Sequence, residues 1–167
     1  MVSKVPYFEQ QKDYTCGPAA LRMVFKFFNV RRSEAQLKRR LKTTARGGTD
    51  HRAMIRTAER EGFYCYVNTY SSLAEVKYYL HTGHPVIVNY IEPSDNEGHY
   101  AVVTGYSHNH LILNDPLNGR NFKIHNRTFS RRWRSGDGKK VRWIMVISKK
   151  PFTLGKQYYP LKKRLAL

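Results

Sequence analysis

Residues 16–30 read CGPAALRMVFKFFNV, and the spacing of their apolar side chains predicts a helix. Large apolar residues recur at steps of three and four, at Leu21, Val24, Phe25 and Phe28, which places them on one face. Pro18 falls in the first turn, where a proline ring interrupts no hydrogen bond. The helix is therefore expected to begin at Cys16 and to hold a thiol at its N-terminus.

Three further helices are expected after this one, over residues 33–41, 50–62 and 71–83. Each begins near a residue that can cap a helix N-terminus: Ser33 for the first, Thr49 or Asp50 for the second, and Ser71 or Ser72 for the third. Glycines end the last two helices. Between those two, the stretch FYCYVNTY is typical of a strand because it is rich in aromatic and β-branched residues.

From Pro85 onward the pattern changes to apolar runs that predict strands. These runs are PVIVNYI at 85–91, HYAVVTGY at 99–106, HLILND at 110–115, NFKIH at 121–125 and VRWIMVIS at 141–148. Helices followed by an antiparallel sheet predict an α+β fold. We expect a single domain over residues 1–150 and a basic C-terminal extension over residues 151–167.

The composition excludes several classes of protein. The chain has 167 residues, of which 41% are hydrophobic and 25% charged, so it can form a core and is not a disordered chain. No apolar run approaches the roughly 18–20 residues of a membrane span, and residues 1–14 lack the apolar stretch of a secretory signal. With two cysteines and no such signal, we expect a reducing, cytoplasmic compartment rather than a disulfide.

Cys16 is a candidate nucleophile because of its place in the first helix. Backbone N–H groups and the positive end of the helix dipole meet at a helix N-terminus, and both favour a thiolate. Gly17 leaves room for a substrate to approach. The alternative for Cys16 is a buried structural thiol, and we interpret Cys65, in the middle of an expected strand, as a core residue.

A nucleophilic thiol needs a base, and the base needs a group that orients it. His99 begins one expected strand and Asp115 ends the next. If residues 107–109 form the turn, Tyr106 faces His110. His99 then lies diagonal to Asp115 on the same face, about 7–8 Å away at the backbone, whereas a turn of even length would put them on opposite faces. The alternatives are a polar strand-end histidine and a turn-forming aspartate.

Gln10 and Gln11 precede Cys16 by six and five residues, and either amide can donate to an oxyanion near the thiolate. The alternative is that both glutamines are simply solvated. No metal site or cofactor is expected, because His108, His110 and His125 have no cysteine or acid beside them at metal-like spacing. The remaining histidines, His51, His81 and His84, are expected at helix edges facing solvent.

The stretches VPYFEQQKDYTCGPAAL, GHPVIVNY, GHYAVVTGY and LILNDP resemble the bacteriocin-processing cysteine peptidases, which remove double-glycine leader peptides, and their stand-alone relatives. That family belongs to the papain-like superfamily, and the resemblance extends over about residues 4–148. It implies a papain-like fold, with an N-terminal helical half packed on a C-terminal antiparallel sheet. It also implies a cysteine peptidase that acts on a peptide or protein substrate.

The resemblance further implies a role for each candidate. Cys16 corresponds to the nucleophile, His99 to the base and Asp115 to the orienting group. The oxyanion glutamine of the family stands six residues before the cysteine, which selects Gln10 over Gln11. The family's preference implies cleavage after small residues such as Gly-Gly. Many members are domains of peptide-exporting transporters, but this sequence shows no membrane span or nucleotide-binding motif, so coupling to export is not implied.

The resemblance does not explain the charge of the chain, which is +18. The stretch from Arg120 to Leu167 holds 15 of the 30 lysines and arginines but only one of the 12 acids. Such a field attracts nucleic acid, acidic peptides or anionic lipid. A second hypothesis is therefore a catalytically inactive, peptidase-like module that binds nucleic acid or an acidic partner, its basic residues alternating with Phe129, Trp133 and Trp143. A solvated basic face is the alternative.

Overall fold

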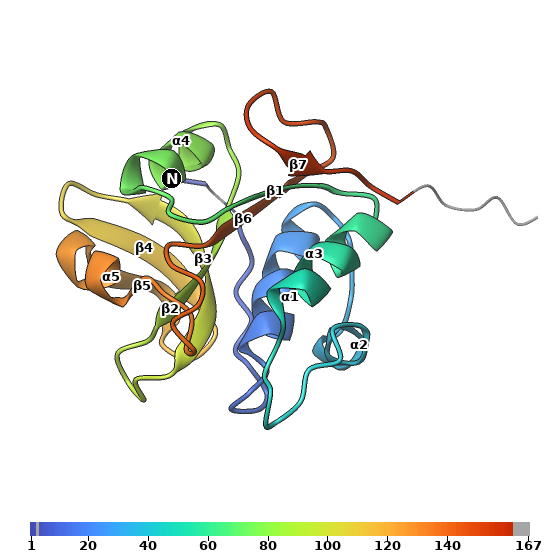
Figure 1. The fold of residues 1–167 in the computed structure, drawn as a ribbon, viewed down its shortest axis with the longest axis horizontal. Coiled ribbons are helices and arrows are strands. Elements are labelled where there is room, and N and C mark those ends of the chain that lie inside the picture. The colour runs from blue at the N-terminus through green and yellow to red at the C-terminus, as the bar shows by residue number, and fades with distance from the viewer. Residues whose placement is uncertain (3, 162–167) are drawn as a thin grey trace, which may run out of the picture.

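A computed structural model describes residues 1–2 and 4–161 and contains five helices and seven strands (Figure 1). The helices are α1 Cys16–Phe27, α2 Glu34–Arg40, α3 His51–Arg60, α4 Leu73–His81 and α5 Asn126–Arg132. The strands are β1 Tyr64–Asn68, β2 Val86–Ile91, β3 Gly98–Tyr106, β4 His110–Asp115, β5 Gly119–His125, β6 Ile144–Ser148 and β7 Gln157–Tyr158. None of the described helices has the length and apolar character that a bilayer crossing requires.

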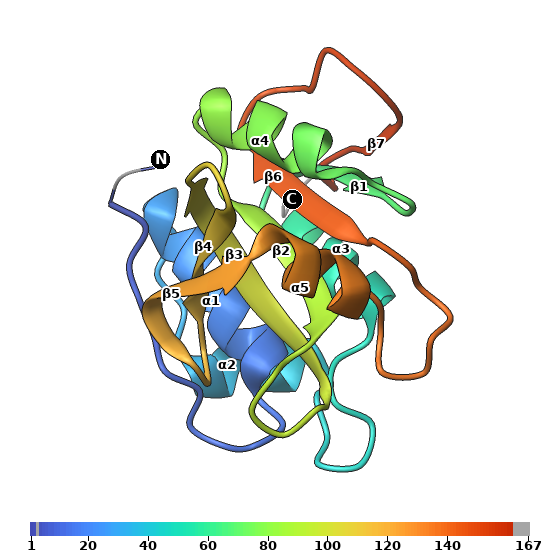
Figure 2. The ribbon, with the colours of Figure 1, turned by 90° about the vertical axis from the view of Figure 1, so that its left-hand side faces the viewer.

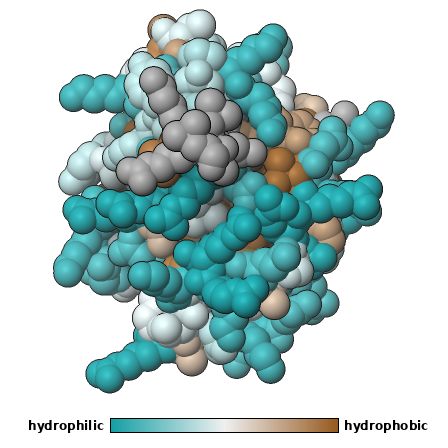
Figure 3. Space-filling view, turned by 90° about the vertical axis from the view of Figure 1, so that its right-hand side faces the viewer, coloured by the Kyte–Doolittle hydropathy of each residue, from teal (hydrophilic) through white to brown (hydrophobic). Residues whose placement is uncertain are grey.

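The strands form one antiparallel sheet in the order β5-β4-β3-β2-β6-β1-β7. Helices α1, α2 and α3 lie on one side of the sheet and α5 on the other (Figures 1 and 2). Helix α1, which begins at Cys16, belongs to the helical half of the fold, and β3, near whose start His99 lies, belongs to the sheet. The two elements pack against each other. The outer face of the α2–α3 side is largely hydrophilic (Figure 3). The predicted α+β fold is confirmed.

The helix starts follow the local signals in the sequence. Helix α1 begins at Cys16, as predicted, and ends at Phe27, before Asn29 takes a positive φ of 63°. The caps of the next three helices are Ser33, Asp50 and Ser72, each accepting a hydrogen bond from a backbone N–H of the first turn. At α2 the cap is reciprocal, because the side chain of Gln36 also accepts from the backbone N–H of Ser33.

Two elements were not expected from the sequence. Helix α5 has seven residues and buries only Phe129, so it has no apolar period that a pattern could reveal. Strand β7 has two residues and pairs with Cys65 and Tyr66 of β1. It lies in the C-terminal extension, whose residues 162–167 are outside the described part of the chain. The division into a domain and an extension at residue 150 stays a prediction.

The hairpin of β3 and β4 differs from the expected one at its turn. Tyr106 pairs with Leu111 rather than His110, so the turn has four residues and not three. A β-bulge at Thr104 then shifts the register by one, and from Val103 onward the pairing is the expected one. The backbone N–H of Val2 donates to the carbonyl of Thr104 at 2.7 Å, so the N-terminal segment engages the bulged residue. The predicted turn was wrong, and the bulge restores the predicted face for the strand ends.

Candidate active site

Cys16 is half-buried as the first residue of α1, and the side chain of its N-cap, Thr15, makes no capping hydrogen bond. The hydroxyl of Thr15 instead bonds to the backbone of Lys12 at 3.0 Å. The N–H groups of the first helical turn therefore keep their donor capacity beside the thiol. This arrangement suits an anionic group bound next to the sulfur.

His99 and Asp115 are brought together at the ends of β3 and β4. The Nε2 atom of His99 lies 2.7 Å from Oδ1 of Asp115, and the two side chains are 4% and 0% exposed. Oδ1 also accepts the backbone N–H groups of Leu117 and Asn118, each at 2.9 Å. Oδ2 accepts the hydroxyl of Tyr90 at 2.5 Å. Four donors thus hold one buried carboxylate in a single orientation.

The imidazole of His99 lies between this carboxylate and the thiol. Burial disfavours the charged ring, but the hydrogen bonds and charges of Asp115 and Cys16 outweigh it and raise the pKa of His99 to about 10. Since Nε2 is engaged with Asp115, Nδ1 is the atom left for Cys16. Burial also opposes the charge of Asp115, yet its bond to His99 holds the pKa of that carboxyl below the ordinary value. The arrangement favours a proton on His99.

The two candidate glutamines differ in their surroundings. Gln10 is half-buried, and its Nε2 donates to the carbonyls of Lys12 at 3.0 Å and Asp13 at 3.1 Å. The backbone N–H of Gln10 donates to the carbonyl of Pro116 at 3.0 Å, which ties its loop to the residue after Asp115. Gln11 is exposed. Of the two, only Gln10 is bonded through its backbone N–H to the residue after Asp115, and its side-chain amide must exchange one of its two bonds to donate elsewhere.

Sequence reasoning missed a second contact between the halves of the fold. The hydroxyl of Tyr100, the residue after His99, donates to the carbonyl of Thr49 at 2.9 Å and lies 2.9 Å from Nδ1 of His51. The Thr49 side chain presses on Gly17, where an added Cβ would lie 2.4 Å from its hydroxyl oxygen. Tyr100 therefore joins the strand of His99 to the loop that touches the neighbour of Cys16.

The prediction that His51 faces solvent was wrong. Its ring packs against that of Trp143 at 4.3 Å between centroids, and its Nε2 has no hydrogen-bond partner among the described residues. Burial lowers the pKa of His51 to about 4, so the ring is neutral at pH 7. His84 is half-buried as well, and His81 is exposed as expected. No local pattern marks His51, because the residues that bury it, Tyr100 and Trp143, come from distant parts of the chain.

The Tyr100→Phe variant is expected to lower both stability and activity. The ring would stay packed, but the Thr49 carbonyl and Nδ1 of His51 would lose their partner, at a cost of about 1–3 kcal/mol in unfolding free energy. Looser positioning of the thiol is expected to lower kcat/KM about tenfold or more. Denaturant unfolding and steady-state kinetics measure the two effects. Tyr106→Phe, at the exposed end of the same strand, is the control. Full activity in a destabilised Tyr100→Phe protein would assign the hydroxyl to stability alone.

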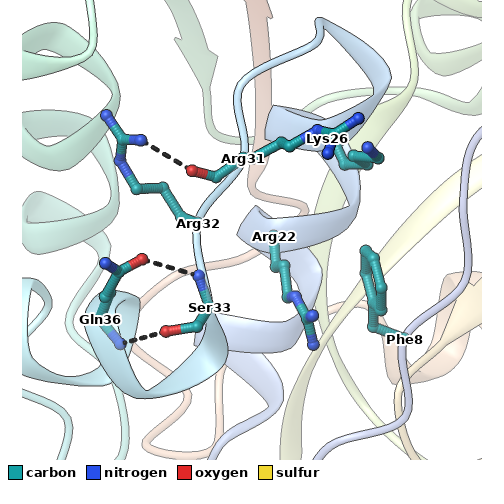
Figure 4. A pocket seen from close by; sticks show the side chains of 7 residues that line it. All are labelled: Phe8, Arg22, Lys26, Arg31, Arg32, Ser33 and Gln36. Atoms are coloured by element: carbon teal, nitrogen blue, oxygen red, sulfur yellow. Dashed lines mark hydrogen bonds between the residues drawn. The ribbon is translucent and has the colours of Figure 1, made fainter.

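Two cavities of the structure are lined by other residues. One, of about 460 Å³, lies between the N-terminal segment, α1 and α2 (Figure 4). The guanidinium of Arg22 stacks 3.8 Å from the ring centroid of Phe8 on its wall. The other, of about 490 Å³, lies between the end of α2 and α3. Neither cavity includes Cys16, His99 or Asp115.

Metal-ligand types and the aromatic residues of the C-terminal third lie as follows among the described residues. Among them, no three histidine, cysteine or acidic side chains are grouped so as to hold a metal, although the rings of His110 and His125 lie 5.2 Å apart. Phe129, Trp133 and Trp143 are 0%, 2% and 2% exposed and belong to the core. The expectation that these aromatic rings alternate with basic residues on a nucleic-acid surface was wrong, because buried rings cannot stack on bases.

A family model described as peptidase C39-like matches residues 2–141. A search among curated proteins finds no match.

Several solved structures share the fold. The peptidase domain of Streptococcus ComA, a bi-functional ABC transporter involved in a quorum sensing pathway, has 24% identity and a TM-score of 0.72, and the match covers 88% of this chain and 100% of that one. A double glycine motif protease from an AMS/PCAT transporter, solved in complex with the leader peptide, has 22% identity and a TM-score of 0.68 over 87% and 91%. A Bacillus anthracis protein described as a C39-like peptidase has 17% identity and a TM-score of 0.74 over 90% and 98%. These similarities establish the fold as that of papain-like C39 peptidase domains.

Proposed function

Because the chain belongs to the peptidase C39-like family, we propose that it is a cysteine peptidase in which Cys16 is the nucleophile, His99 the base and Asp115 the orienting group. The contact of 2.7 Å between His99 and Asp115, shielded from water and adjacent to the half-buried thiol, is the observation that supports this most. Asp115 has three donors besides His99, so the carboxylate has no structural need of a histidine, whereas a catalytic imidazole needs such a partner.

The mechanism follows from the positions of the protons. The thiolate of Cys16, paired with protonated His99, attacks the peptide carbonyl carbon, and the oxyanion is held by the backbone N–H of Cys16 and the amide of Gln10. His99 then gives its proton to the departing amine, so the C–N bond breaks and a thioester remains on Cys16. Water, deprotonated by His99, attacks the thioester carbonyl carbon, the C–S bond breaks, and the acid leaves the thiolate of Cys16 beside protonated His99.

The proposed substrate is a peptide or protein cleaved after small residues such as Gly-Gly. One structural relative is described as a double glycine motif protease in complex with a leader peptide, which supports this choice. Gly17, next to Cys16, is buried, and its missing Cβ leaves space for Thr49 rather than for a substrate, contrary to the expectation from the sequence. Cys16 and Cys65 are both free thiols, which fits a reducing, cytoplasmic setting.

The pH dependence of cleavage tests the proposal. Since the pKa of His99 is raised from 6.5 to about 10, the ring stays protonated through neutral pH, and the alkaline limb of kcat/KM for a fluorogenic peptide ending in Gly-Gly should lie at about pH 10. A peptidyl acyloxymethyl ketone with the same Gly-Gly end should form a single adduct on Cys16, detected by intact mass and peptide mapping. Labelling with no preference for Cys16, or with no dependence on His99, would contradict the proposed site.

A further inference from the structure

The cavity between the end of α2 and α3 has a wall rich in cations. Its volume is about 490 Å³, and five of its lining residues are basic: Arg40, Lys42, Arg52, Arg56 and Arg60. The carboxylate of Asp50, the acidic residue of the wall, caps α3 by accepting the backbone N–H of Arg52 at 2.6 Å. The outer surface over α2 and α3 is correspondingly hydrophilic, with long side chains projecting from it (Figure 3). We name this cavity, with its basic residues Arg40, Lys42, Arg52, Arg56 and Arg60, the arginine groove.

Most of the positive charge in the arginine groove has no acidic partner. Arg40 is bonded to Glu61. Among the described residues, Lys42 and the three arginines of α3 form no ion pair. Arg52, Arg56 and Arg60 follow one another at intervals of four residues, so they stand about 6 Å apart along one face of the helix. A row of unpaired guanidinium groups at this spacing suits a ligand with several carboxylates.

The arginine groove is connected to Cys16 through two intervening residues. Gly47 and Gly48 line it, and the next residue, Thr49, is the one that contacts Gly17. Only Thr49 and Gly17 therefore separate the groove from Cys16 along this path. The groove belongs to the helical half of the fold, on the side of the thiol, whereas His99 belongs to the sheet.

The chemistry of cleavage indicates which part of a substrate reaches the groove. His99 protonates the departing amine, so the segment C-terminal to the cleaved bond passes the sheet side of the site. The acyl segment stays attached to Cys16 at the start of α1. Of the two segments, the one N-terminal to the cleaved bond is therefore held on the half of the fold that carries the groove.

We propose that the arginine groove binds an acidic segment of the substrate, located N-terminal to the cleaved bond. In an extended peptide every second side chain points the same way, at intervals of about 6.6–7 Å, which is close to the spacing of the arginines. Asp or Glu at alternate positions can then meet Arg52, Arg56 and Arg60 in turn. The inference rests on the proposed peptidase function for its direction, and its binding part can be tested without cleavage.

The binding test uses a Cys16→Ala protein and fluorescein-labelled peptides with one Gly-Gly site. Three peptides are compared: one with Asp at three alternate positions upstream of Gly-Gly, one with Asn at those positions, and one with the Asp residues downstream. We expect the upstream Asp peptide to bind at least tenfold more tightly than either of the others by fluorescence anisotropy, and to lose this advantage in high salt. Equal affinity for the three peptides, or preference for the downstream one, would overturn the inference.

Variants assign the effect to the groove. Arg56→Gln with Arg60→Gln should remove the tenfold preference, whereas Arg22→Gln with Lys26→Gln removes the same charge from the wall of the other cavity and should retain it. Equal losses in both pairs would reduce the effect to net charge and contradict the site. A single-stranded oligonucleotide that binds more tightly than the Asp peptide, with the same dependence on Arg56 and Arg60, would make the groove a nucleic-acid site instead.

Cleavage assays with the unsubstituted protein separate the two proposals. If the Asp and Asn peptides are both cut, with a KM at least tenfold lower for the Asp peptide, both proposals are supported. If both peptides are cut with the same KM, the groove inference fails and the peptidase stands. If neither is cut although the Asp peptide binds selectively, the peptidase proposal fails and the acidic-peptide site remains.

Discussion

A Cys16→Ala protein is expected to lose at least about 10⁴-fold in kcat/KM, which removes measurable cleavage. The nucleophile forms the acyl intermediate itself, so no neighbouring group can take over that step. The change removes one sulfur atom from a half-buried position, and the unfolding free energy should change by about 1 kcal/mol or less. Cleavage of a Gly-Gly peptide, covalent labelling and chemical denaturation are the measurements.

Cys65 provides the matched control for this variant. Its side chain is fully buried, and burial raises the pKa of the Cys65 thiol far above the ordinary value, so it is inert as a nucleophile. Cys65→Ala should therefore destabilise the fold by about 1–2 kcal/mol through the space it leaves in the core, yet keep kcat and covalent labelling. If Cys16→Ala cleaves as well as the parent protein, the thiol at the start of α1 is not the nucleophile.

Asp115→Ala is expected to reduce both activity and stability. Without the carboxylate, the ring of His99 loses its orientation, and kcat/KM should fall by roughly 10²–10⁴-fold. The hydroxyl of Tyr90 and two backbone N–H groups also lose their acceptor in a buried place, so we expect the unfolding free energy to fall by about 3–5 kcal/mol. Kinetics and urea denaturation at neutral pH measure the two losses.

Asp115→Asn separates orientation from charge. The amide oxygen can still accept from His99, so this variant should keep more stability and activity than the alanine variant. The negative charge that helps to raise the pKa of His99 is gone, and the alkaline limit of kcat/KM should move to a pH clearly below about 10. An unchanged alkaline limit in Asp115→Asn would mean that the carboxylate does not act on His99.

The Asp115–His99 pair also makes the unfolding free energy depend on pH. Asp115 has a lowered pKa, so its contribution is present above about pH 3.8 and is lost as pH falls through the folded value. His99 has a raised pKa, so its contribution is complete below 6.5 and is lost as pH rises toward about 10. The stability difference between parent and Asp115→Ala should therefore be largest between about pH 4 and 6.5 and should shrink on both sides.

The candidate catalytic residues could be predicted because their residue types and their positions within helices and strands can be read from short stretches of sequence. A thiol at a helix start and an imidazole and a carboxylate on neighbouring strands are visible in the order of residues. That His99 and Asp115 lie on the same face of the sheet also depended on the turn between β3 and β4, which is one residue longer than expected. The Thr104 bulge compensates for this, and it forms where the distant Val2 donates to the Thr104 carbonyl. A contact over a hundred residues is not encoded in the hairpin itself.

The sequence alone determined where α1 begins, that Ser33 caps α2, the adjacent pairs of residues that hold the caps of α3 and α4, and that a sheet follows the helices. These features depend on side-chain periodicity and on hydrogen bonds within one helical turn, so neighbouring residues suffice to specify them. Only the tertiary structure decided that the hydroxyl of Tyr90 bonds to Asp115 and that of Tyr100 to the Thr49 carbonyl. It also decided that Trp133 and Trp143 are buried and that basic residues of α2 and α3 line one groove. Burial and pairing between segments arise when distant parts of the chain exclude water together, and no short stretch of sequence carries that information.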